Sequence, residues 1–131
     1  MYSGTCLCGA VAYQIHGDIG EVVICHCQRC RKANGSAYAV NAPINRADFQ
    51  LLKGETSLKE FSSSPGVNRV FCGNCGAPIY SKRDNDSSHY RLRLGTLDTP
   101  LNHGPSLHVF AASKAEWDLI CDGLPQYAER P

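Results

Sequence analysis

The chain has 131 residues, of which 43% are hydrophobic and 19% are charged, and its formal net charge is +1. This composition predicts one folded domain over residues 1–131 and argues against a disordered chain. No apolar run approaches the roughly 20 residues that a membrane span needs, and the N-terminal sequence does not have the pattern of a secretory leader, so we expect a cytoplasmic protein without a membrane partner.

Short strands separated by Gly, Pro, Asn, Asp and Ser are expected along the whole chain, with little helix. Alternating apolar and polar residues predict the first strand at Ala10–His16. The other expected strands are Glu21–Ile24, Ser36–Val40, Phe49–Lys53, Ser57–Phe61, Asn68–Cys72, Pro78–Lys82, Tyr90–Leu94 and Leu107–Ala111. Helical turns are expected at Gln28–Ala33 and near Lys114–Ile120. The sequence therefore predicts a mainly β fold.

Two local signals predict where particular strands end and how they pair. Pro43 should end the strand that begins at Ser36–Val40, because proline cannot donate to a sheet ladder. The tripeptide Gly-Glu-Thr lies between Phe49–Lys53 and Ser57–Phe61. Such a connection is a hairpin signal, so these two strands are expected to pair with each other.

Eight cysteines are present, and in a reducing compartment they indicate metal binding or catalysis more than disulfides. The sequence Cys72-Gly-Asn-Cys75-Gly76 is typical of a metal knuckle, in which both sulfurs face one ion and the glycine permits a positive φ. A closed zinc site needs two more ligands. Cys6 and Cys8 are the candidates, because a one-residue spacing places two side chains on the same face of a strand. The alternative is a redox C-x-x-C motif, which the sequence context does not favour.

Three further cysteines, Cys25, Cys27 and Cys30, fall within six residues. Three protein ligands and one free position are the pattern of a catalytic zinc site, where water or a substrate sulfur fills the fourth position. An iron–sulfur cluster is an alternative, although it usually takes four cysteines at other spacings. His26 could replace a cysteine as ligand, but between two cysteines on one face it should point the other way.

Other residues near these motifs have two interpretations each. Arg29, Arg31 and Lys32 adjoin the three-cysteine motif and could bind carboxylates of an anionic substrate, or could form a solvated basic turn. His108 alternates with apolar residues and is interpreted as a hydrogen-bonded structural histidine, with an acid–base role as the alternative. Cys121 is expected to be an ordinary buried cysteine.

The motifs GTCLCGAVAYQIHG, CHCQRCRKANGSAY, FCGNCGAPIY, GTLD and LHVF…W…DGLPQY together resemble the glutathione-dependent formaldehyde-activating enzyme family. The resemblance runs from about Gly4 to Tyr127. It implies a β-tent fold of short antiparallel sheets stapled by zinc, with two Zn²⁺ sites. By this resemblance the structural site is formed by Cys6, Cys8, Cys72 and Cys75, and the catalytic site by Cys25, Cys27 and Cys30.

The resemblance also implies an activity, a carbon–sulfur lyase reaction in which formaldehyde and glutathione give S-hydroxymethylglutathione. Zinc would hold the glutathione sulfur as a thiolate beside the carbonyl and stabilise the developing alkoxide. The alternative is a non-enzymatic, zinc-stapled module that binds a small thiol or a protein partner. Nucleic acid is not an expected partner, because two zinc ions on seven thiolates would leave a net charge of about −2 and no basic stripe is present.

Overall fold

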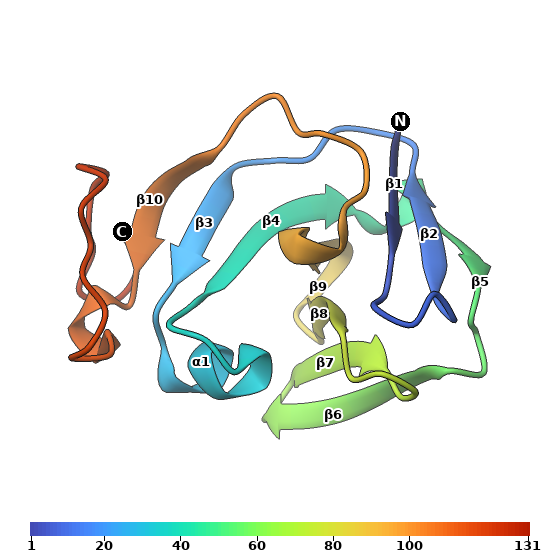
Figure 1. Ribbon diagram of the computed structural model, residues 1–131, viewed down its shortest axis with the longest axis horizontal. Coiled ribbons are helices and arrows are strands. Elements are labelled where there is room, and N and C mark those ends of the chain that lie inside the picture. Colours follow the sequence, from blue (N-terminus) through green and yellow to red (C-terminus); the bar gives the residue numbers. More distant parts are fainter.

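The computed structural model describes all residues from Met1 to Pro131 and contains two β-sheets, one short α-helix and three 3₁₀ turns. A three-stranded sheet has the order β1-β2-β5, and a seven-stranded sheet has the order β10-β3-β4-β9-β8-β7-β6 (Figure 1). All pairings are antiparallel except that of β10 with β3. The predicted mainly β fold with little helix is confirmed.

The elements follow one another with short connections. The strands are β1 Tyr2–Thr5, β2 Ala12–Ile15, β3 Val22–Cys25, β4 Ala39–Asn45, β5 Phe49–Lys53, β6 Leu58–Ser64, β7 Val67–Cys72, β8 Pro78–Arg83, β9 Asp86–Arg93 and β10 Pro105–Val109. The α-helix is α1 Gln28–Asn34, and the 3₁₀ turns are Arg46–Asp48, Leu94–Thr96 and Ala111–Ser113. None of the helices has the length and apolar character that a membrane crossing requires.

The main core lies where the small sheet packs on one face of the large sheet. Tyr13 and Ile15 of β2 are fully buried against Ile44, Val70 and Leu92, which come from β4, β7 and β9. Because side chains alternate along a strand, the residues between these core positions point to the opposite face of the large sheet. The two faces of that sheet therefore have different environments, and the second face carries the site described below.

Two predictions about strands are wrong. Phe49–Lys53 forms β5 but pairs with β2, whereas the following strand β6 pairs with β7 in the other sheet, so the Gly-Glu-Thr turn connects two sheets instead of closing a hairpin. Strand β4 also continues through Pro43 to Asn45. Proline is tolerated there because the pairing of β4 with β3 begins only at Asn41, so no ladder hydrogen bond on that side needs an amide hydrogen from residue 43. On the same side, the Pro43 carbonyl accepts a hydrogen bond from the Gly20 amide.

The C-terminal segment covers the edge of β10. Residue 108 pairs in parallel with Gln126, and the backbone amides of His108 and Phe110 donate to the carbonyls of Pro125 and Glu129. The predicted helical turns near Lys114–Ile120 are absent, and only a 3₁₀ turn precedes them. This return of the chain places the C-terminal residues along the outer edge of β10, on the side away from β3 (Figure 1).

Candidate metal centres

Four cysteines from two sheets meet in the first cluster, hereafter the quartet. Cys6 and Cys8 lie in the turn after β1, while Cys72 ends β7 and Cys75 lies in the turn that follows. The four Sγ atoms lie within 4.8 Å of one another, with Cys6 3.6 Å from Cys8 and Cys8 3.8 Å from Cys72. A tetrahedral zinc with Zn–S bonds of about 2.3 Å separates its sulfurs by about 3.8 Å. The quartet therefore fits a zinc ion.

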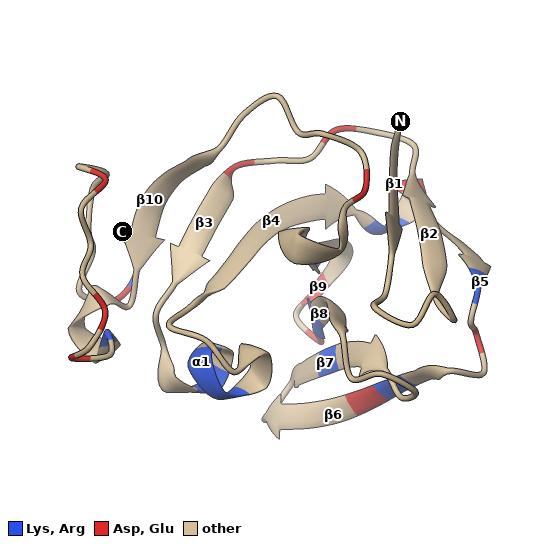
Figure 2. Ribbon diagram, viewed as in Figure 1, with Lys and Arg blue, Asp and Glu red and all other residues tan.

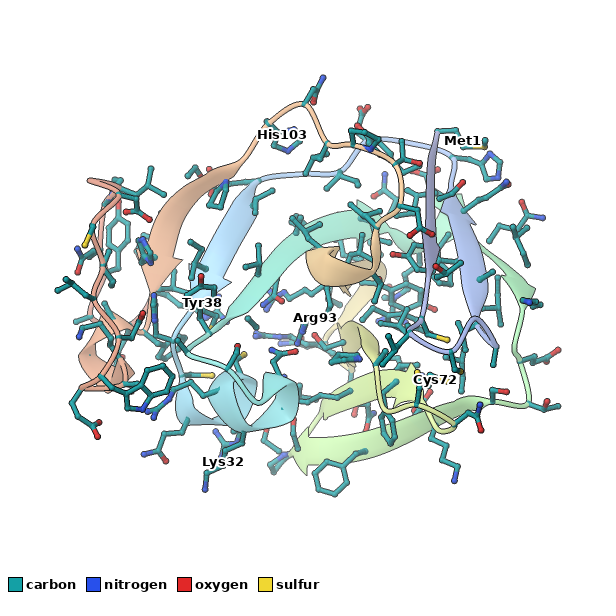
Figure 3. All side chains as sticks on the ribbon, in the orientation of Figure 1. Met1, Lys32, Tyr38, Cys72, Arg93 and His103 are labelled. Carbon is teal, nitrogen blue, oxygen red and sulfur yellow. The ribbon has the colours of Figure 1, made fainter.

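The expectation that Cys6 and Cys8 share a strand face is wrong, because β1 ends at Thr5. Instead, the conformation of the turn after β1 directs both sulfurs to the same cluster. The amide of Val11 donates to Cys6 Sγ at 3.2 Å, and Asn74 Nδ2 donates to Cys8 Sγ at 3.2 Å. Figure 3 shows Cys72 below the lower end of the β1–β2 hairpin, where the two sheets approach each other.

Hydrogen bonds in the quartet favour the thiolate forms that a metal needs. Donation from the backbone at Ala10, with that of Asn74, lowers the pKa of Cys8, and donation from the backbone at Ala77 lowers the pKa of Cys75 to about 6. Burial raises the pKa of Cys72 to about 11. A bound cation would offset that burial effect by stabilising the thiolate.

The second cluster, hereafter the trio, forms where β3 passes into α1. Cys25 is the last residue of β3, Cys27 caps the helix and accepts from the Cys30 amide at 3.4 Å, and Cys30 lies in the first helical turn. Their three Sγ atoms also lie within 4.8 Å of one another. Hydrogen bonds from Cys25 and Cys30 lower the pKa of Cys27 to about 2. Hydrogen bonds with Cys27 and Cys30, followed by burial, raise the pKa of Cys25. The trio thus has one thiol that readily becomes a thiolate.

His26 points away from the trio, as expected from its place between Cys25 and Cys27. It is fully buried, and its Nε2 lies 2.7 Å from Nδ1 of His108, whose Nε2 lies 2.8 Å from Asp122 Oδ2. Burial, followed by the charge of His108, lowers the pKa of His26. These hydrogen bonds connect His26, which lies between Cys25 and Cys27, to His108 and Asp122 on the side away from the trio. His108 is therefore buried and hydrogen bonded, as its structural interpretation expects.

A cavity of about 360 Å³ lies in front of the trio and opens on the second face of the large sheet. Its most frequent lining residue is arginine. The six arginines are Arg29, Arg69, Arg83, Arg91, Arg93 and Arg130. Arg69 is the arginine in contact with the trio, because both of its terminal nitrogens lie 3.8 Å from Cys30 Sγ. Figure 2 shows Lys and Arg on α1 and β7, and Figure 3 places Arg93 near the middle of the molecule, between α1 and the sheet.

Only one of these arginines, Arg29, belongs to the basic residues that the sequence places beside the three-cysteine motif. Of the three basic candidates, Arg29 lines the cavity, Arg31 donates to the carbonyl of Ser113, and Lys32 lies outside the cavity. The strand arginines were missed, although the alternation Arg91-Leu92-Arg93 already places two arginines on the face opposite a core leucine.

Other expectations about single residues also need correction. Cys121 was expected to be buried but is exposed, and it does not belong to either cluster. Neither Cys121 nor His26 therefore supplies a fourth ligand to the trio. The seven other cysteines group as predicted, and either cluster could hold a metal ion.

Comparison with known proteins agrees with this architecture. Residues 1–113 match the family described as "glutathione-dependent formaldehyde-activating enzyme". A Schizosaccharomyces pombe protein named an uncharacterized lyase is 26% identical over 89 residues, which cover 68% of this chain and 63% of that protein. The chain thus spans less than two thirds of this relative. A crystal structure of a Rhodobacter sphaeroides protein superposes with a TM-score of 0.63 at 22% identity, covering 76% of this chain and 91% of that one.

The two sheets and the two thiol clusters define a mainly β protein with two candidate metal centres. The match over residues 1–113 goes further, and the chain belongs to the glutathione-dependent formaldehyde-activating enzyme family. The likeness to the solved structure supports the fold alone.

Proposed function

We propose that this protein is a zinc-dependent carbon–sulfur lyase that acts on a small thiol adduct in the cavity beside Cys25, Cys27 and Cys30. The observation that carries the proposal is a three-thiol cluster with no fourth protein ligand, facing a cavity. Family membership suggests formaldehyde and glutathione as the reactants, with S-hydroxymethylglutathione as the adduct.

The donor sets support zinc in both clusters, with the quartet as the structural site and the trio as the catalytic one. Thiolate sulfur suits zinc, and a three-ligand site leaves one position for a substrate. When bound to the trio, zinc would lower the pKa of a substrate thiol and so increase its thiolate fraction at neutral pH.

In the forward reaction one carbon–sulfur bond forms between the thiol sulfur and the formaldehyde carbon. The carbonyl π bond breaks, its electron pair goes to oxygen, and the proton that leaves sulfur ends on that oxygen. The reverse reaction breaks the carbon–sulfur bond and returns the proton to sulfur.

The chain's own residues would act by position and charge. Cys25 and Cys30 are buried and Cys27 is half-buried. A substrate sulfur bound at the trio would therefore be accessible to bulk water only from the cavity side. Arg69 offers guanidinium donors next to Cys30, where they can stabilise the oxygen as it gains negative charge.

The test is turnover of S-hydroxymethylglutathione by the zinc-loaded protein, after subtraction of the uncatalysed reaction. Cys27→Ser should reduce kcat/KM by at least about a hundredfold, since it removes one of three metal ligands. Cys121→Ser is the matched control, because it makes the same exchange at an exposed cysteine outside both clusters. Equal rates for Cys27→Ser and the control would reject the proposal.

A further inference from the structure

The cavity in front of the trio carries more positive charge than any protein group balances. Six guanidinium groups line it, and Glu21 is the only carboxylate among its lining residues. None of the six arginines forms an ion pair. Three thiolates with one divalent ion would add a net −1, so the cavity would keep a charge of about +4. A charge of this size in a small space attracts an anion.

Strand register brings four of these arginines to one face of the sheet. Arg69 of β7 lies opposite Ser81 of β8, and Ser81 lies opposite Arg91 of β9. Arg93 and Arg83 each follow by two residues along their own strands, so they project from the same face. The positive charge is therefore built into the rigid sheet and is concentrated beside the trio.

Without a bound anion, this concentration of buried positive charge destabilises the charged forms of the arginines. Burial lowers the pKa of Arg93 to about 10, and burial with the charge of neighbouring arginines also lowers the pKa values of Arg83 and Arg91. Arg93 is 7% exposed, and its Nη1 donates to the Arg91 carbonyl. The Nε of Arg69 is buried without any hydrogen-bond partner. A buried guanidinium donor without a partner, among arginines of like charge, indicates a site whose partner is an oxyanion.

We propose that this cavity selects a compact thiol, or its adduct, with at least two oxyanionic groups close to the sulfur. This inference rests on the proposed lyase function and narrows its substrate. Glutathione fits the charge less well, because its two carboxylates lie at opposite ends and one adjoins an ammonium group. In a compact dianion, both charged groups reach the arginines while the sulfur reaches the trio.

The test is calorimetric binding to the zinc-loaded full chain at fixed ionic strength, with 2-mercaptosuccinate, 3-mercaptopropionate and glutathione as probes. The dianion 2-mercaptosuccinate should bind about tenfold or more tightly than either of the others, since a second charge-assisted contact contributes at least that factor. Succinate, which has no sulfur to remove zinc, should compete with it. Equal affinity for the mono- and dianionic thiols, or tighter binding of glutathione, would overturn the inference.

Two kinds of variant distinguish binding by the arginines of the cavity from a general effect of the protein's positive charge. Arg91→Gln should reduce 2-mercaptosuccinate affinity about tenfold, whereas Lys32→Gln removes the same charge outside the cavity and should change it less than twofold. Arg91→Gln should also leave the melting temperature of the unliganded protein unchanged or raised, because it relieves repulsion. Arg83→Gln, from the neighbouring strand, is a second variant with the same expectation. Equal losses in Arg91→Gln and Lys32→Gln would overturn the inference.

Turnover measurements distinguish failure of this inference from failure of the lyase proposal. Absence of formaldehyde-adduct turnover with every thiol, together with a retained preference for the dianion in binding, would reject the lyase and support the anion site. Faster turnover of the glutathione adduct than of the mercaptosuccinate adduct would reject the inference and leave the lyase intact.

Discussion

The quartet and the trio use the same ligand chemistry in different structural settings. The quartet joins the turn after β1 to the last residue of β7 and the turn that follows it, so it links the small sheet to the large one. The trio lies within six consecutive residues, where β3 passes directly into α1. It therefore does not join parts of the chain that are far apart in the sequence. This contrast indicates that a metal ion would contribute to folding mainly at the quartet, and to chemistry mainly at the trio.

The solvent exposure of the cysteines does not separate the quartet from the trio. Cys8 of the quartet is exposed, whereas Cys25 and Cys30 of the trio are buried. The difference between the clusters is therefore not one of solvent access to sulfur. It lies in the number of protein ligands and in their surroundings, because the quartet is held by local amide donors and the trio faces arginines.

The largest expected effect is on folding. Cys75→Ser should unfold the protein or nearly so, because a structural zinc site contributes on the order of 10 kcal/mol to folding. Cys27→Ser should remain folded and lose one metal ion. Circular dichroism melts and metal analysis of the two variants measure this difference. Equal losses of stability in the two variants would show that the structural role is not confined to the quartet.

Metal removal should occur in two steps. A chelator should first take the ion from the trio, which has three protein ligands, and the far-ultraviolet circular dichroism should not change during this step. Loss of the second ion should coincide with unfolding. The Cys27→Ser variant is the control, since it should show the second step only. Unfolding during the first step would contradict the comparison.

The sequence predicts much of this contrast, because metal ligands form local motifs. The C-x-x-C-G knuckle and the three-cysteine motif identify seven thiols that the structure brings into two clusters. The strand patterns likewise locate most of the ten strands. These features depend on residues that are close in the sequence, and single-sequence reasoning is most reliable for them.

The arginine face could not be predicted in the same way, because it depends on strand pairing. Arg69 and Arg91 become neighbours only through Ser81 on the strand between them. The same limitation explains the incorrect hairpin after β5, where the turn sequence suits a hairpin but burial of Tyr13 draws β5 to β2. Tertiary packing decided both cases, and local propensity carries little information about it.

A smaller effect is expected behind the trio. His108→Ala should lower the free energy of unfolding by about 1–3 kcal/mol, since it leaves the buried His26 without its partner. It should also weaken metal binding at the trio and leave the quartet unchanged, because His26 lies between two trio cysteines. Metal affinity of each cluster, measured by competition with a chromophoric chelator, is the readout. Asp122→Asn retains the shape and should lose less, and equal weakening at both clusters would contradict a role specific to the trio.

The smallest effect is expected at the quartet's exposed edge. Asn74→Ala removes the amide that donates to Cys8 Sγ at 3.2 Å and should cost no more than about 1 kcal/mol of stability. Asn74→Asp keeps the shape but places a carboxylate beside the thiolates, so it should weaken metal binding at the quartet further, and more so at low ionic strength. Melting curves with and without chelator compare the two variants. Because this donor reaches a single sulfur, the order Asn, Ala, Asp in metal affinity tests whether amide donation to sulfur stabilises the quartet, and equal affinities would show that packing around the four thiols is sufficient.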